Sequence, residues 1–260
     1  MRALITGHKG TVGQALSQAL QAAGHTVIGW ERNEISPLDF AAQPAFLDRV
    51  APEVIFHLAV PSVATGIAQE GWRITVEWSE FLAAEAARRG VPLVFSSTAM
   101  VFNNAALGPF TVNSEPNAAE GYGFEKRMAE QRVMAAHPAA RIVRLGWQIG
   151  PMPVGNNMLA AASRQMAEQG CIYASRRWLP ATSFLTDTAE ALIQVLSLPP
   201  GVYMADSNRH HSYYAILHAL SAHYHLGWRV LPTEDFIYDQ RMQDPRLVLP
   251  DLQRRLPELG

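Results

Sequence analysis

Tyr122 and Lys126 stand four residues apart in the segment Tyr-Gly-Phe-Glu-Lys. Residues at this spacing share one face of a helix, so a phenol and an amine are expected side by side. An ammonium group beside a phenol favours the phenolate, which predicts that the pKa of Tyr122 falls toward working pH. A tyrosine tuned in this way exchanges a proton with a carbonyl or alcohol oxygen. The pair therefore predicts acid–base chemistry on a ketone or an alcohol.

Thr98 is the expected third member of this site. It follows the apolar run 93–96, which reads as a buried strand. A hydroxyl at the C-terminal end of a parallel strand lies where such sheets bind their ligands. We therefore expect Thr98 to hydrogen-bond the reacting oxygen, although a Ser or Thr in this place also serves as a simple strand-end cap.

A glycine-rich turn follows the first apolar run. Its spacing, Gly7-x-x-Gly10-x-x-Gly13, comes between an expected strand and an expected helix. Glycines in this context allow a tight turn and let the backbone approach a pyrophosphate, and the helix N-terminus offers amides to that anion. The alternative is an ordinary strand-to-helix turn. The expected dinucleotide contacts are Gly7, Lys9, Gly10, Thr11, Val12 and Gly13.

The end of the second expected strand bears on the choice of cofactor. Glu31 lies 18 residues past Gly13, close to the offset of about 20 residues expected for an acid that binds the adenine ribose. A carboxylate there favours NAD, because it repels a 2′-phosphate. Lys9 and Arg32 favour NADP, because both can reach that phosphate. The sequence leaves NAD and NADP open, and a solvated strand end remains the alternative for Glu31 and Arg32.

These residues need a scaffold of alternating strands and helices. We expect strands at 3–6, 26–30, 54–58, 93–96 and 141–145, and helices at 12–23, 40–50, 74–89 and 122–136. Strands that alternate with helices indicate a parallel sheet covered on both faces, a doubly wound α/β fold of the Rossmann type. Beyond residue 150 we expect helices at 157–169, 187–198 and 213–224 and a short strand at 202–204. The predicted organisation is a dinucleotide-binding domain, 1–150, and a smaller mixed lobe, 151–260, with some return of the chain to the first domain.

Composition excludes several classes of function. The chain has 260 residues, a formal net charge of −2 and no apolar stretch free of breakers, so neither nucleic acid nor a membrane is an expected partner. The first seven residues lack the pattern of a signal peptide, and the single cysteine, Cys171, suits the reducing cytoplasm. The histidines show no metal-ligand spacing. Of 21 basic residues only Lys9 and Lys126 are lysines, and both fall at expected cofactor contacts.

Together these segments resemble the extended short-chain dehydrogenase/reductase family. The resemblance covers nearly the whole chain and rests on Thr6–Gly13, Asp39-Phe40, His57-Leu58-Ala59, Ser96-Ser97-Thr98, Tyr122 with Lys126, and Arg144-Leu145-Gly146-Trp147. It implies a bound NAD(P), a nucleotide-sugar substrate in the C-terminal lobe, and Thr98, Tyr122 and Lys126 as a catalytic triad with Tyr122 as acid/base. It also implies that Lys126 binds the nicotinamide ribose, that Asp39 and Phe40 lie by the adenine, and that Leu58, Ala59 and Val60 lie beside the dinucleotide.

Within that family the chain is most similar to the dTDP-4-dehydrorhamnose reductases, through residues 144–147, 180–184 and 201–203. Trp147 is expected to stack on a base or shape the pocket, with a core tryptophan as the alternative. Arg176 and Arg177 are expected to clamp a pyrophosphate, with a solvated basic pair as the alternative. The substrate lobe is short and matches less well than the cofactor domain.

Sibling activities differ at the residues after Thr98. The 4,6-dehydratases carry an Asp-Glu pair there, and the GDP-fucose-synthase type carries a cysteine, whereas this chain has Ala99 and Met100. We therefore expect NAD(P)-dependent reduction of the 4-keto group of a nucleotide sugar. A nucleotide-sugar 4-epimerase and a non-catalytic NAD(P)-binding regulatory subunit are the alternatives. A homodimer is expected through helices 74–89 and 122–136, as in relatives of the family, and the alternative is that their apolar faces are covered within one chain.

Overall fold

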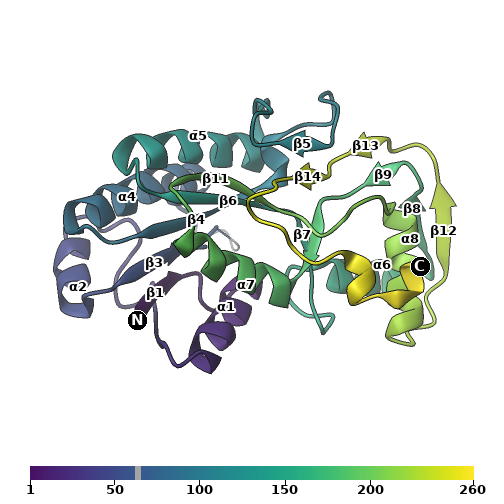
Figure 1. Ribbon diagram of the computed structural model, residues 1–260, viewed down its shortest axis with the longest axis horizontal. Coiled ribbons are helices and arrows are strands. Elements are labelled where there is room, and N and C mark those ends of the chain that lie inside the picture. The colour runs from purple at the N-terminus through teal and green to yellow at the C-terminus, as the bar shows by residue number, and fades with distance from the viewer. Residues whose placement is uncertain (62–65) are drawn as a thin grey trace.

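A parallel sheet forms the centre of the molecule (Figure 1). The computed structural model describes residues 1–61 and 66–260, and in this part of the chain the sheet has six strands. Their spatial order is β2 (Thr26–Gly29), β1 (Arg2–Thr6), β3 (Val54–His57), β4 (Leu93–Thr98), β6 (Arg141–Leu145) and β11 (Gly201–Ala205). Most of these strands are continuous buried runs, as expected when both faces of a sheet are covered. The predicted doubly wound α/β fold is confirmed.

Helices cover both faces of the sheet (Figure 1). One face packs against α1 (Thr11–Ala22) and α7 (Leu185–Gln194), with Leu16, Leu20 and Leu192 fully buried. The other packs against α2 (Gln43–Val50), α4 (Trp78–Arg89) and α5 (Gly121–Ala136). No helix among the described residues combines the length and apolar composition needed to span a membrane.

Two expected helices differ from the structure. The segment expected as one helix at 74–89 is preceded by α3 (Glu70–Trp72) and opens with a π-helical turn, η1 (Arg73–Glu77), before α4. Periodicity over five residues does not distinguish a π turn from an α turn. The helix expected at 40–50 begins at Gln43, because the Asp39 carboxylate accepts the Ala42 amide at 3.1 Å and holds residues 39–42 in a turn.

A smaller lobe is built from α6 (Met158–Gln169), α8 (Tyr213–His223) and pairs of short parallel strands. Its core includes Ile172, Ile216, Leu217 and Leu252. The strand pairs are β7 (Trp147–Ile149) with β10 (Thr182–Phe184), β8 (Ile172–Ser175) with β12 (Val230–Thr233), β9 (Trp178–Leu179) with β13 (Tyr238–Asp239), and β5 (Phe110–Thr111) with β14 (Met242–Gln243). Short 3-10 turns, Leu252–Arg254 and Pro257–Leu259, close the chain beside α8.

The chain returns from this lobe to the main sheet. α7 packs against α1, and β11 pairs with β6 along its full length, from Gly201 opposite Arg141 to Ala205 opposite Leu145. The strand expected at 202–204 therefore completes the main sheet rather than the smaller lobe. Spacing and composition do not reveal this assignment, because it depends on pairing between segments about sixty residues apart.

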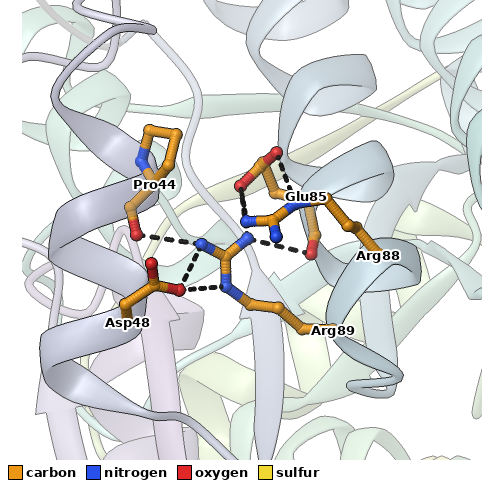
Figure 2. A network of polar contacts seen from close by, with 5 residues as sticks. All are labelled: Pro44, Asp48, Glu85, Arg88 and Arg89. Atoms are coloured by element: carbon orange, nitrogen blue, oxygen red, sulfur yellow. Dashed lines mark hydrogen bonds and ion pairs between the residues drawn. The ribbon is translucent and has the colours of Figure 1, made fainter.

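Arg89, at the C-terminal end of α4, joins that helix to α2 (Figure 2). Its guanidinium donates to the Asp48 carboxylate at 2.6 and 3.0 Å and to the Pro44 carbonyl at 2.9 Å. It also contacts the Glu85 carboxylate, which accepts a second arginine, Arg88, at 3.1 Å. The Arg89 side chain is only 11% exposed, so these bonds hold two helices from a largely buried position.

Candidate active site

The glycine-rich loop lies at the switch point of the sheet, where β2 and β3 flank β1 on opposite sides. In such sheets the crevice at the carboxyl ends of these strands binds ligands. Gly7 has φ +70°, and a Cβ on it would lie 3.0 Å from the Ala59 backbone. A Cβ on Gly13 would lie 2.1 Å from the Gly7 carbonyl oxygen. Helix α1 begins after Gly10 with no side-chain cap, so its first amides are left for an external acceptor. This cradle fits a dinucleotide pyrophosphate.

A buried polar network joins β1 to the end of β3 next to this cradle. The Thr6 hydroxyl accepts the amides of Leu58 and Ala59 at 3.1 and 3.2 Å and lies 2.7 Å from Nδ1 of His57. Nε2 of His57 lies 2.8 Å from the Ser79 hydroxyl, which donates to the Thr75 carbonyl. A neutral His57 with its proton on Nε2 satisfies both hydroxyls. Burial, and then the charge of Lys126, lowers the pKa of His57 to about 3, in keeping with this tautomer.

The residues expected to lie near the adenine ribose form a cluster of charges. Nζ of Lys9 donates to the Glu31 carboxylate at 2.7 Å, and Nε2 of His8 lies 3.2 Å from the other oxygen. The Lys9 hydrogen bond lowers the pKa of Glu31. Lys9 is 72% exposed, and Arg32 is also exposed. Glu31, which favours NAD, is thus paired with Lys9, which favours NADP.

The other expected dinucleotide contacts are distributed around this loop. Phe40 stacks on Phe81 of α4 with ring centroids 4.8 Å apart, and Asp39 caps the turn before α2. Leu58 is buried, Ala59 packs beside Gly7, and Val60 is exposed after the end of β3. Their predicted contacts with adenine and dinucleotide remain predictions.

The structure brings Thr98, Tyr122 and Lys126 to the C-terminal end of β4. Thr98 ends that strand, and its hydroxyl accepts the Met100 amide at 3.2 Å, capping the 3-10 turn η2 (Ala99–Val101). A Cβ on Gly123 would lie 2.0 Å from the Met100 carbonyl oxygen, so only glycine lets α5 sit this close to η2. Lys126 is 1% exposed, and its Nζ donates to the Ser96 carbonyl at 2.8 Å.

The expected effect of Lys126 on Tyr122 is wrong for the structure as it stands. Desolvation of the phenol, with a smaller contribution from Glu125, raises the pKa of Tyr122 to about 12, although 38% of the residue's surface is exposed. The Lys126 ammonium lies 6.0 Å from the Tyr122 ring centroid and is directed to Ser96. Burial lowers the pKa of Lys126 itself to about 7, against the opposing charges of Glu130 and Glu125. Helical spacing indicates that two groups are neighbours, but not how far each is removed from water.

In the smaller lobe, Trp147 belongs to an aromatic cluster. Its ring centroid lies 6.2 Å from Trp178 and 5.9 Å from Tyr213, and Phe236 packs edge-on against Trp178 at 5.3 Å. Nε1 of Trp178 is buried without a hydrogen-bond partner. This cluster offers flat faces to a ring, as expected for Trp147, and also matches the alternative of a packed core tryptophan.

Arg176 and Arg177 are exposed, and within residues 1–61 and 66–260 neither forms a hydrogen bond or ion pair with Thr98, Tyr122 or Lys126. The Arg176 guanidinium lies 5.0 Å from the Tyr214 ring centroid. Among residues 1–61 and 66–260, no group of three or more His, Cys, Asp or Glu side chains is arranged to hold a metal ion.

A loop from the smaller lobe reaches the glycine-rich loop. The Asn156 amide donates to the Thr11 hydroxyl at 3.1 Å, and a Cβ on Gly155 would lie 2.8 Å from that oxygen. Asn157 stabilises the loop by accepting the Ala160 amide at the start of α6 and donating to the Met152 and Val154 carbonyls. Sequence reasoning missed this contact and the Thr6–His57–Ser79 network, although His57 was visible in the segment His57-Leu58-Ala59.

Comparison with known proteins agrees with this geometry. A "Spore coat polysaccharide biosynthesis protein SpsK" of Bacillus subtilis is 23% identical over 222 residues, 84% of this chain and 78% of that protein. A dTDP-4-dehydrorhamnose reductase of Mycolicibacterium smegmatis is 27% identical over 210 residues, 78% of this chain and 63% of that protein. The structure of a dTDP-4-dehydrorhamnose reductase from Clostridium acetobutylicum matches with a TM-score of 0.85 at 21% identity, over 100% of this chain and 98% of that one. Another from Bacillus anthracis, in complex with NADP, matches with a TM-score of 0.84 at 19% identity, over 99% and 98%.

A parallel sheet with a dinucleotide cradle and a Tyr–Lys pair at one edge defines an NAD(P)-dependent oxidoreductase of the extended short-chain type, and this predicted class is confirmed. The particular family follows from the match of the RmlD substrate binding domain family to residues 1–228. The chain belongs to that family.

Proposed function

We propose that the protein reduces the 4-keto group of a nucleotide sugar with NADH or NADPH. The observation that carries this proposal is the placement of a protonated Tyr122 and a buried Lys126 at the end of β4, beside Thr98. Relatives named for the reduction of dTDP-linked keto sugars support the substrate class. The matched regions span between 53% and 72% of those relatives.

The glycine-rich loop and the first turn of α1 would hold the pyrophosphate. Lys126 would bind the nicotinamide ribose. Bound in this way, the reduced nicotinamide supplies the hydride for the keto carbon. The contributing residues would be Gly7, Lys9, Gly10, Thr11, Val12, Gly13, Glu31, Arg32, Asp39, Phe40, Leu58, Ala59 and Val60.

Three side chains would handle the substrate oxygen. Tyr122 keeps its proton at neutral pH, because burial raises its pKa to about 12, and it donates that proton as the oxygen gains charge. The Thr98 hydroxyl orients the oxygen by a hydrogen bond. The Lys126 ammonium, fixed to the Ser96 carbonyl, contributes positive charge beside the phenol.

In the smaller lobe, Trp147 is proposed to contact the base or sugar, because its cluster offers flat aromatic faces. Arg176 and Arg177 are proposed to bind the pyrophosphate, since their guanidinium groups are accessible. Both assignments rest on residue type and position in the lobe.

The decisive experiment mixes purified protein with a panel of nucleotide-linked 4-keto sugars and NADH or NADPH, and follows cofactor absorbance. Loss of one cofactor per product, reduced about 10²-fold or more in Tyr122→Phe, is the expected result. Interconversion of 4-epimers without net cofactor loss would instead identify an epimerase. Tight cofactor binding without turnover on any sugar would identify a regulatory subunit.

We further propose a cytoplasmic homodimer. The single cysteine, Cys171, is buried and free, which suits a reducing compartment. The dimer would form through the outer faces of α4 and α5, where Arg132 of α5 pairs with Glu80 of α4 at 2.8 Å. Light scattering of the purified protein gives the mass of the particle, and a monomer at micromolar concentration would contradict the dimer.

A further inference from the structure

A buried ion pair lies one helical turn beyond Lys126. Tyr122, Lys126 and Glu130 follow each other at every fourth position of α5 and so share one face of the helix. The Glu130 carboxylate accepts two bonds from Arg144 of β6, at 2.9 and 2.7 Å. The two residues are 6% and 4% exposed. Arg144 pairs in register with Ser97 of β4, the residue before Thr98.

Stability alone is a poor reason for this pair. Removing two charges from water costs several kcal/mol for each ion, and apolar replacements of a buried pair are often neutral or stabilising. Nη1 of Arg144 is moreover buried without a hydrogen-bond partner. An arrangement this costly next to a proposed catalytic lysine calls for an electrostatic role.

The charge of Glu130 acts on Lys126. It opposes the effect of burial on the lysine and raises its pKa, and Glu125 does so to a smaller extent. Arg144 holds the carboxylate against β6, which leaves the ammonium directed to the Ser96 carbonyl and over the Phe95 ring, 4.4 Å from its centroid. His57 of β3 is neutral and adds no charge.

The remaining charges on elements packed against α5 are nearer to solvent. The pairs Arg73–Glu77 of η1 and Arg132–Glu80 are between 39% and 45% exposed, so water screens them. Glu70 of α3 lies on that side as well, and the C-terminal part of α4 carries Glu85, Arg88 and Arg89, which pair with one another and with Asp48. Glu130 is therefore the charge with the largest effect on Lys126, and it is only 6% exposed.

We propose that Glu130, held in place by Arg144, is a positioning residue that keeps the Lys126 ammonium charged and directed toward β4. Glu130 supplies the favourable charge, and Arg144 limits it by holding the carboxylate away from the amine. This inference rests on the proposed function for its meaning in catalysis, but not for its test.

The chain makes a direct test available, because Lys9 and Lys126 are its only lysines. Protein labelled with ¹³C at the lysine ε-carbons gives two signals, which Lys9→Met assigns. Glu130→Gln should lower the Lys126 titration midpoint by about one pH unit, and Arg144→Met should raise it by a smaller amount, because Arg144 acts on the lysine through the carboxylate that it holds. The exposed Lys9 is the internal control and should not move. Midpoints that stay unchanged, or shift in the same direction in both variants, overturn the proposal.

A second variant covers the case in which a lone buried charge prevents folding. Glu130→Leu with Arg144→Leu removes both charges and keeps an apolar contact, and its Lys126 midpoint should fall below that of the wild type. An unchanged midpoint overturns the proposal. In turnover assays the alkaline limit of kcat should shift with the same sign as each midpoint, with little change in KM. Shifted midpoints in a protein that reduces no keto sugar would overturn the proposed function and leave this electrostatic role standing.

Discussion

The amine of Lys126 lies 2.8 Å from the carbonyl oxygen of Ser96, so helix α5 is fastened to the same strand that ends in Thr98. Lys126 and Thr98, two members of the proposed triad, are thereby fixed relative to each other, because Lys126 bonds to Ser96 of the strand that Thr98 ends. The third, Tyr122, is fixed by the close approach of Gly123 to Met100. The site is built from one strand end and one helix start, and errors in either position displace it.

Replacing Lys126 should show whether turnover depends on its positive charge alone or also on the size of the ammonium group. Lys126→Arg keeps the charge, but a planar guanidinium is larger than the ammonium that fits between Ser96 and the Phe95 ring. We expect turnover to fall about 10²-fold in Lys126→Arg and at least as much in Lys126→Met, with kcat measured at saturating cofactor. Full activity in Lys126→Arg would show that charge alone suffices.

Gly123→Ala should uncouple α5 from β4. The new methyl group would meet the Met100 carbonyl oxygen at 2.0 Å, a backbone atom that cannot move aside as a side chain does. We expect a loss of stability of about 1–3 kcal/mol and a larger loss of kcat. Gly260→Ala is the control, since its Cβ would meet only an ordinary contact at 3.4 Å. Urea denaturation and turnover measure the two effects, and wild-type values for Gly123→Ala would contradict the geometry.

His57 should make the protein sensitive to acid. Its pKa is about 3 in the folded protein, against 6.5 for a histidine in water, so between these values the unfolded chain binds the extra proton. The contribution of His57 to stability is therefore present above pH 6.5 and is lost as the pH falls toward 3. The difference in free energy of unfolding between wild type and His57→Gln should shrink from about pH 7.5 to about pH 4.5. A difference that does not vary with pH would show that His57 is not buried as a neutral group.

The Lys9–Glu31 pair should set the balance between cofactors. Glu31→Gln removes the charge that repels a 2′-phosphate and frees Lys9 and His8 to bind it. We expect the ratio of NADPH to NADH affinity to rise about tenfold, as for a single partly screened charge. Lys9→Arg, which keeps the charge, should shift the ratio much less. Equilibrium binding of both cofactors measures the ratio, and no change in Glu31→Gln would remove Glu31 from the adenine site.

Arg89→Ala should loosen α2 from α4, because it removes the bonds that the largely buried guanidinium makes to Asp48, Pro44 and Glu85. We expect about 2 kcal/mol of lost stability and a Tm lower by a few degrees. Arg88→Ala is the matched control, since Arg88 is 57% exposed and bonds only to Glu85. Equal Tm values for the two variants would mean that the contacts in Figure 2 contribute little.

The residues predicted from local spacing meet in the structure, and those that depend on distant partners were missed. Gly7, Gly13 and the Tyr122–Lys126 pair are visible because strand ends and helix starts place neighbours in sequence at one edge of the sheet. The Glu130–Arg144 pair joins a helix and a strand, and the Thr6–His57 bond spans 51 residues. Periodicity carries no information on such pairings.

The direction of the Tyr122 pKa was mistaken for a related reason. The pattern Tyr-x-x-x-Lys identifies the neighbour that lowers a phenol pKa, whereas the desolvation that raises it comes from atoms that the whole fold brings around the phenol. The same holds for Lys126, whose type is read from the sequence and whose pKa of about 7 is set by the core around it.

The position of β11 at the edge of the sheet has a consequence for folding during synthesis. This last strand of the sheet leaves the ribosome only after residue 205, when α6 and most strands of the second lobe have already been synthesised. Until then β6 keeps an open edge, and the face that α7 will cover, with Leu16 and Leu20, stays exposed to solvent. A fragment that stops at residue 150 is therefore expected to aggregate rather than fold, and the nucleotide-binding half is completed late in translation.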